Sequence, residues 1–456
     1  MRSPIELLKA SRLVPHQGYC IKDYKKNGGI FASGVQVAIE FKRNFKSVSL
    51  YRVSWEPKQH FLREVNCSID KRTSKTLLLS TSGLDPGMYL LMVDNGAIKF
   101  YINPPQKQEI GVIVPTLTEW AYHHDGFYWS NHRRLTHYMM MAAKKFGLLT
   151  ELTSSLEKRY PSLFVYPYHF PAHREIKLTG YYIQNPRWRD SVRDFFDPFL
   201  NDIDLLWSEE YKCGIPLAAM LDKLSAPVAF FSDFDLVLHS SDLYDLNKII
   251  LYGAEMMTAT GFEFLSQVQE KGKPHVLFWG MQGIGAKEVH YDADSGVMYW
   301  KGAKGECGLS GEVVDNAPVS WGEGDGAIFG FSFPTPLSPG WRTMHSRLVV
   351  DHANDHLVKG INAQQLKFSN PNCQPADNPG LTNAGGEFFD KHNPESQVIA
   401  HLDDIEQRIG IGRFGVFTHV SPTYLPAFGA YFSDLRPEVL TILKNWLNED
   451  TTGGAV

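Results

Sequence analysis

The spacing of apolar residues changes near residue 108, and this change constrains the fold more than any other feature of the sequence. Before it, apolar and polar residues alternate, as in Val35–Phe41. After it, Ile110–Val114 is apolar throughout. Alternation is typical of a strand with one buried face, whereas a short continuous apolar run is typical of a parallel strand buried on both faces. The sequence therefore predicts two architectures in one chain.

Residues 1–107 are predicted to form a β-sandwich of the immunoglobulin-like type. Strand-like runs follow one another up to residue 104. Asp85-Pro86-Gly87 lies between two of them and favours a tight turn, because Pro fixes φ and Gly accepts a positive φ. Short strands with such turns are typical of antiparallel sandwiches, and Pro104-Pro105 then indicates a linker.

Residues 108–456 are predicted to form a three-layer α/β domain with a parallel sheet. Further buried strands are predicted at Pro227–Phe231, Ile249–Tyr252 and Val276–Trp279. A helix is predicted between the last two, and this alternation implies parallel pairing with right-handed crossovers. The other predicted elements are helices at 133–149, 260–270 and Pro437–Leu447, a hairpin at His290–Trp300 and a strand at Arg413–His419.

Charge, cysteine content and motifs exclude several classes of protein. The chain has 456 residues and a net charge of −5, so no general basic excess favours nucleic acid or an anionic membrane. Five cysteines form no CxxC pair, which argues against a disulfide framework or a zinc ribbon. Gly280–Gly285 misses the GxGxxG spacing, and GK[ST], GxSxG and HExxH do not occur. With no signal peptide and no spanning apolar run, the cytoplasm is the predicted location.

Polar residues follow two of the predicted buried strands, at the edge where open α/β sheets bind ligands. The segment after Ile110–Val114 is either a polar surface loop or a site, and its candidates are Tyr122, His123, His124, Asp125 and Tyr128. Glu255 follows Ile249–Tyr252 just before a helix, where it is either a functional carboxylate or only a partner of the helix dipole. Asp233-Phe234-Asp235 closes a third strand and is expected at the same edge.

Five segments occur in an order that is more specific than any one of them. They are PTLTEWAY (115–122), HHDGFYWSNHRR (123–134), FFSDFDL (230–236), the stretch 248–281, and FGVFTHVSPTYLPAF followed by ILKNWL. In this order they resemble the strand ends, the His-x-Asp-Gly loop and the closing strand and helix of the large (β) subunit of N,N-dimethylformamidase and its relatives. The resemblance extends from about residue 80 to residue 448.

This resemblance implies a glutamine-amidotransferase-like α/β core behind a β-sandwich, and a mononuclear iron that hydrolyses an amide C–N bond. Two tyrosinates and one carboxylate hold the iron in the family, and Fe³⁺ suits such hard oxygen ligands. Carried over to this chain, the carboxylate is Glu255, and the preferred tyrosines are Tyr122 and Tyr128, with Tyr168 as the alternative. His123, His124 and Asp125 are the expected acid–base residues, with His239 a further source of a proton.

The chain departs from the family at several positions around this site. The family's His in Gly-x-His-x-Glu corresponds to Gly253, its Tyr-Trp to Met256-Met257, and the Asn at the next strand end to Met281. These changes predict a more apolar amide substrate. Two other functions stay open: a non-catalytic binding or scaffold protein, and a metal-free amidotransferase-like tailoring enzyme. The expected partners are a small amide and either a second copy of the chain or a small accessory subunit.

Overall fold

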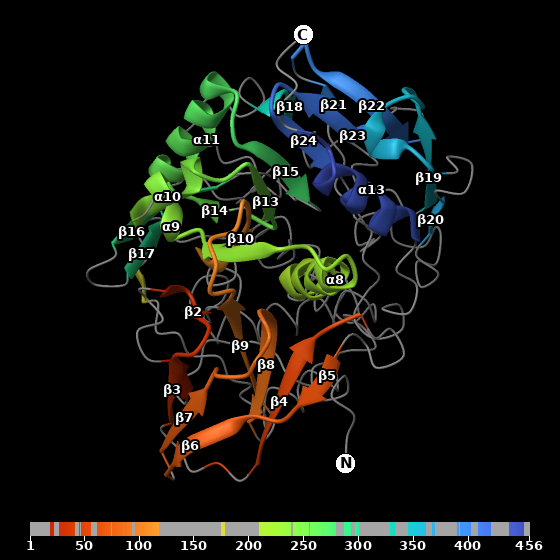
Figure 1. The fold of residues 1–456 in the computed structure, drawn as a ribbon. Coiled ribbons are helices and arrows are strands. Elements are labelled where there is room, and N and C mark those ends of the chain that lie inside the picture. Colours follow the sequence, from red (N-terminus) through yellow and green to blue (C-terminus); the bar gives the residue numbers. More distant parts are fainter. Residues whose placement is uncertain are drawn as a thin grey trace, which may run out of the picture.

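The computed structural model shows a mixed α/β protein with several β-sheets (Figure 1). It describes residues 19–21, 27–41, 45, 47–55, 62–73, 75–93, 96–117, 175–177, 209–238, 240–254, 256–279, 287–292, 297–300, 329–332, 345–361, 367–369, 390–391, 393–402, 409–420 and 437–450. The red and orange strands of the N-terminal part lie on one side of the molecule, and the green to blue elements of the remainder lie on the other.

The N-terminal part consists of two facing β-sheets. One has the order β1 (Tyr19–Ile21), β3 (Gln36–Phe41), β7 (Thr76–Ser80), β6 (Ser68–Arg72), and the other has the order β2 (Ile30–Ala32), β9 (Gly96–Asn103), β8 (Gly87–Val93), β4 (Val48–Val53), β5 (Leu62–Val65). Neighbours are antiparallel except β2 and β9. In β3, Val37 and Ile39 are buried while Gln36 and Glu40 are exposed, as the alternating pattern predicts.

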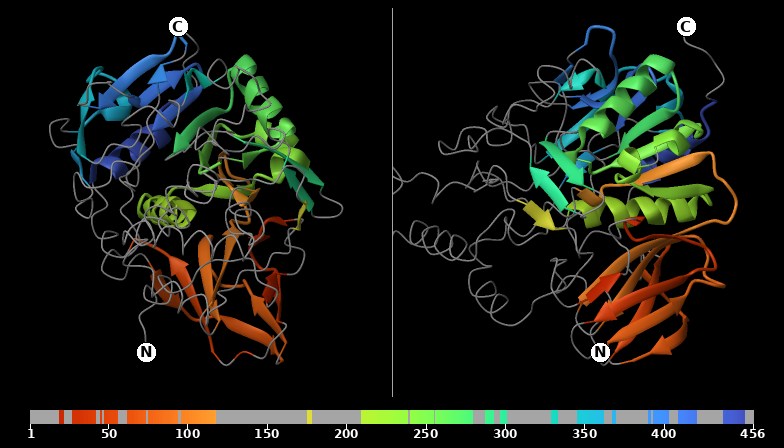
Figure 2. Two further views of the ribbon diagram at one scale, coloured as in Figure 1. Left: turned by 180° about the vertical axis from the view of Figure 1, so that it is seen from behind. Right: turned by 90° about the vertical axis from the view of Figure 1, so that its left-hand side faces the viewer.

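A nine-stranded sheet forms the centre of the second part (Figure 2). Its order is β12 (Val228–Ser232), β10 (Ile110–Val114), β13 (Lys248–Tyr252), β15 (His275–Trp279), β24 (Phe417–Val420), β23 (Ile409–Phe414), β22 (Gln397–Leu402), β19 (His345–Val350), β20 (Lys367–Ser369). The first five strands are mutually parallel, which confirms the predicted parallel pairing. The remaining pairs are antiparallel, so the sheet is mixed and not purely parallel as predicted.

Helices cover both faces of the parallel strands. Helix α8 (Glu209–Lys223) buries Ile215 in the same cluster as Ile250 and Leu277 of the sheet. On the other face, α11 (Ala259–Lys271) buries Phe264 in a second cluster, together with residues of α9 (Asp235–Leu238) and of the segment after α10 (Ser240–Tyr244). Because successive side chains of a strand point to opposite faces, each fully apolar strand contributes to both clusters.

The order of the parallel strands creates a switch point. Numbered along the chain, β12-β10-β13-β15-β24 is 2-1-3-4-5. The chain passes from β10 to β12 on one side, with α8 on one face, and then to β13 on the other side, with α9 and α10 on the opposite face. In open α/β sheets, ligands bind in the crevice at the carboxyl ends of the strands where this reversal occurs. Here the switch point lies between β10 and β13.

Several predicted elements are confirmed and one is corrected. The predicted helices at 260–270 and Pro437–Leu447 are α11 and α13 (Pro437–Leu447), and the predicted hairpin is β16 (Lys287–Asp292) paired with β17 (Val297–Trp300). The single strand predicted at Arg413–His419 is wrong. Gly415 adopts φ 55°, and this left-handed residue turns the chain so that β23 and β24 pair as a hairpin. The helix predicted at 133–149 lies outside the described residues.

Helix α13 is fastened to the sheet by a buried lysine. Lys248, the first residue of β13, donates from Nζ to the carbonyl oxygens of Trp446, Leu447 and Glu449 at 2.8, 2.8 and 2.6 Å. The last carbonyls of a helix have no partner within it, and a positive charge there is favourable. Burial lowers the pKa of Lys248, and Glu449 opposes this shift.

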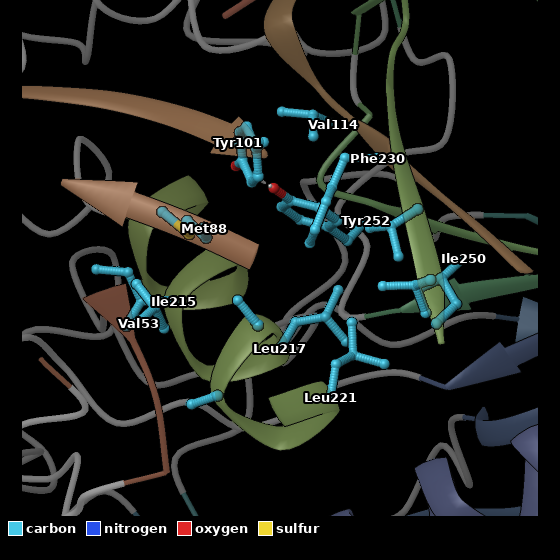
Figure 3. Packing of buried hydrophobic residues seen from close by; sticks show 14 of the residues in the cluster. Val53, Met88, Tyr101, Val114, Ile215, Leu217, Leu221, Phe230, Ile250 and Tyr252 are labelled. Atoms are coloured by element: carbon cyan, nitrogen blue, oxygen red, sulfur yellow. Dashed lines mark hydrogen bonds between the residues drawn. The ribbon is translucent and has the colours of Figure 1, made fainter. Parts of the chain in front are cut away.

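The two parts of the molecule share one hydrophobic cluster (Figure 3). Tyr101 of β9 packs its ring 4.8 Å from that of Phe230 in β12, and its hydroxyl lies 3.2 Å from the hydroxyl of Tyr252. At the rim, Arg52 forms an ion pair of 2.8 Å with Asp222 of α8. The side chain of Asn103 acts as an extra strand residue beside β12, because it donates to Phe230 O at 2.9 Å and accepts from Phe230 N at 2.7 Å.

Replacing Asn103 by Ala is expected to lower the free energy of unfolding by about 1–3 kcal/mol, because the amide and carbonyl of Phe230 both lose a partner. Urea unfolding at neutral pH measures the change. Gln106→Ala, at an exposed position near the same connection, is the matched control and should leave stability nearly unchanged. Equal midpoints for the two variants would contradict the role given to Asn103.

Candidate functional site

The first residues after β10 and β13 lie next to each other at the switch point. Pro115 follows β10 and Gly253 follows β13, and a Cβ atom placed on Gly253 would lie 3.5 Å from Pro115 Cγ. The two strands are parallel neighbours, with Ile113 opposite Leu251. The segments that leave these strands therefore start in contact with each other, at the edge where the sequence predicts the site.

The site residues predicted from the sequence lie beyond these starting points and outside the described residues. This holds for Tyr122, His123, His124, Asp125 and Tyr128 after β10, for Glu255 after β13, and for Tyr168, His239 and Met281. Within the described part of the chain, no group of three or more His, Cys, Asp and Glu side chains could hold a metal ion. The ligand set implied by the resemblance thus stays a prediction.

The N-terminus of α11 is capped by Thr258. Its side chain accepts a hydrogen bond from Gly261 N at 3.1 Å, and the first turn of the helix contains no acidic residue. Glu255 lies three positions before this cap. Thr258 therefore supplies the N-cap of α11, and the helix does not need Glu255 for this purpose.

The backbone conformation at position 253 favours glycine. Its φ is 59°, in the left-handed region where L-residues are strained. The family that the sequence resembles has His at this position. The described contact with Pro115 leaves ordinary van der Waals room for a Cβ atom, so the backbone conformation, and not lack of space, disfavours a larger residue.

Asp233 is a described polar residue at the carboxyl ends of the parallel strands. It directly follows β12 and is only 3 % exposed. Its Oδ2 accepts from Leu117 N at 2.9 Å, and Ser232 Oγ lies 3.3 Å from its Oδ1. Burial raises the pKa of Asp233 well above its usual range, against the opposing effect of these hydrogen bonds. The sequence predicts Asp233 at this edge, and the parallel pairing of β10 and β12 confirms it.

Two hydroxyl groups extend this polar cluster. Ser232 Oγ lies 2.9 Å from Thr116 Oγ1 and 3.3 Å from Asp233 Oδ1, and it accepts from Phe234 N at 3.2 Å. The N-terminal part closes the cluster on one side. A Cβ atom on Gly28, whose φ is 58°, would lie 2.7 Å from Ser232 Oγ, so only glycine allows this approach. No sequence motif indicates that the turn at Gly28 meets the end of β12.

The arrangement of Asp233 also limits what this edge of the sheet can bind. Residues 116 and 117 start a helical turn after β10, and free N–H groups at such a place bind phosphate in doubly wound folds. Here the carboxyl group of Asp233 accepts from Leu117 N. This donor is therefore not available to a phosphate, which agrees with the missing GxGxxG spacing.

The aromatic residues at the neighbouring strand ends are buried. Tyr252 and Trp279 end β13 and β15, and their exposed fractions are 2 % and 0 %. Among the described residues, Trp279 Nε1 has no hydrogen-bond partner. Tyr101 and Tyr252 both belong to the hydrophobic core.

Comparisons with known proteins add little to this picture. No protein-family model matches the sequence, and no curated protein matches it. Among solved structures, the chain is similar to a ThuA-like protein from Bacteroides uniformis, with 12% identity and a TM-score of 0.32 over 53% of this chain and 86% of that one. At this level of likeness, the fold described above rests on the chain's own strands and helices. No helix in the described ranges is long and apolar enough to cross a membrane.

Proposed function

We propose that this protein is an iron-dependent hydrolase that cleaves an amide or related C–N bond of a small, rather apolar substrate. The observation that supports it is the parallel pairing of β10 and β13 at the switch point, which brings Pro115 and Gly253 close together. The segment with Tyr122 and Tyr128 starts at the first of these residues, and Glu255 lies two positions after the second. The proposal thus draws its ligands from two segments that begin side by side.

The proposed ligands fit such an ion by the chemistry of their donors. Two phenolates and one carboxylate would hold Fe³⁺ through hard oxygen atoms and balance its three charges. Thr258 caps α11, so this helix does not need Glu255 as its cap. Bound there, the ion would supply Lewis acidity toward an amide carbonyl.

The chain's own residues have separate tasks in this proposal. Amide hydrolysis needs a proton for the leaving amine, and His123, His124 and Asp125 are the acid–base groups closest in sequence to the proposed ligands. Met257 ends strand β14 (Met256–Met257) and is buried in the same core cluster as Phe264 of α11. Met256 and Met281 are the apolar residues that favour an apolar substrate over a charged one.

The same proposal includes the type of each domain, the cellular location and the assembly of the protein. Residues 1–107 would be an immunoglobulin-like domain, and residues 108–456 a glutamine-amidotransferase-like catalytic domain. The 2-1-3-4-5 strand order with helices on both faces supports the second assignment. We further propose that the protein is cytoplasmic. It would assemble with a second copy of itself or with a small accessory subunit.

Iron analysis and a visible spectrum of the purified protein test the function. We expect one iron per chain and a tyrosinate-to-iron charge-transfer band, together with release of an amine from apolar amides. Protein reconstituted with Zn²⁺ is the control, because zinc has no such band. Colourless protein that takes up no iron would overturn the proposal and favour a scaffold protein or a metal-free tailoring enzyme.

A further inference from the structure

The carboxyl group of Asp233 joins the ends of two strands that are far apart in the sequence. It follows β12, and it accepts from Leu117 N, just after β10, at 2.9 Å. Leu117 and Thr116 are themselves buried, at 1 % and 0 % exposed. The carboxyl group therefore holds the first helical turn after β10 in place.

The surroundings of Asp233 are built to keep this carboxyl group in one position. Ser232 Oγ contacts both Thr116 Oγ1 and Asp233 Oδ1. The next acidic residue, Asp235, accepts from Ser232 N at 2.8 Å and so fixes the backbone from the other side. The turn at Gly28 packs directly on Ser232. The cluster is thus enclosed by β10, β12 and the N-terminal part.

Burying a carboxyl group at this position costs more free energy than burying a neutral side chain. Burial disfavours its ionised form, and a buried carboxyl group loses more hydration than a neutral side chain. A carboxylate oxygen accepts a hydrogen bond from a backbone N–H more strongly than the neutral amide oxygen of Asn does. Costly buried ionisable groups occur preferentially at functional sites.

We propose that Asp233 is a positioning residue, which sets the direction in which the segment containing Tyr122 and Tyr128 leaves β10. This inference rests on the function proposed for the same edge of the sheet. Asp233 acts through the backbone of Leu117.

The test compares Asp233→Asn and Asp233→Ala with Asp242→Asn, an exposed control on α10. In the iron-loaded full chain, both Asp233 variants are expected to shift the maximum of the visible band and to lower kcat with little change in KM. They should also raise the hydrogen-exchange rate of the Leu117 amide tenfold or more. Asp233→Asn keeps the size of the side chain, so it remains informative if Asp233→Ala does not fold.

An unchanged band, an unchanged kcat and unchanged exchange in Asp233→Asn, relative to Asp242→Asn, would overturn the inference. Faster exchange with an unchanged band and kcat would also overturn it, because Asp233 would then be purely structural. Iron-free, colourless wild-type protein would instead overturn the proposed function. In that case the exchange of Leu117 would still show whether Asp233 holds this turn.

Discussion

Glu255→Gln is expected to abolish iron binding and to bleach the visible band. The substitution keeps the shape of the side chain but removes one of three negative charges that would balance Fe³⁺, and a neutral amide oxygen is a much weaker ligand for a hard cation. Tyr122→Phe and Tyr128→Phe should each bleach the band as well, since each removes only the phenolic oxygen. Iron content and absorbance per chain, measured on folded protein, check all three variants.

The control for Glu255 is Glu263→Gln, which removes an exposed carboxylate from α11 and should leave iron and colour intact. If Glu255 only interacted with the helix dipole, Glu255→Gln would cost at most about 1 kcal/mol of stability and would leave the iron content unchanged. Full iron and full colour in Glu255→Gln would show that the ligand assignment is wrong. If Tyr168→Phe bleaches the band and Tyr128→Phe does not, the second tyrosine ligand is Tyr168 and not Tyr128.

Acidification from pH 7 to pH 4 is expected to destabilise the protein through His419 by about 3 kcal/mol. His419 is fully buried between the rings of Phe278 and Phe331, at centroid distances of 4.6 and 4.9 Å, and its Nε2 donates to Phe329 O at 2.9 Å. Burial lowers its pKa from 6.5 to about 3.

The sign of this effect follows from the direction of the shift. The folded state holds the imidazole neutral, while the unfolded chain protonates it below its ordinary pKa. The contribution of His419 is therefore fully present above pH 6.5 and is lost as the pH falls toward about 3.

Urea unfolding between pH 7 and pH 4 measures it for the wild type and for His419→Gln, which cannot titrate and can still donate to Phe329 O. We expect the variant to be less stable at pH 7 but to lose less stability on acidification. His352→Gln, at an exposed position, should behave as the wild type. Parallel pH profiles for His419→Gln and the wild type would contradict the buried neutral imidazole.

Local sequence patterns were sufficient to predict the strands and helices whose apolar residues show which of their faces are buried. Ile110–Val114 could be recognised as a strand buried on both faces, since every side chain is apolar and both core clusters receive some of them. Helix α13 has the predicted bounds because its apolar residues recur on one side. In contrast, α8 contains Gly214 and Pro216, both unfavourable in a helix interior, so its sequence does not predict it. Gly214 is there because Tyr252 Oη approaches to within 3.2 Å of a Cβ position.

The sequence by itself determined that chemically capable residues follow several buried strands. Only the tertiary structure decided which of these strand ends meet. The strand order places β13 and β12 on either side of β10, and this order depends on which helix packs on which face of the sheet. The hydrogen bond between Asp233 and Leu117 joins residues 116 positions apart, and the turn at Gly28 meets Ser232 across the boundary between the two parts. Such contacts leave no periodic signature in the sequence, because each depends on the packing of elements that are distant along the chain.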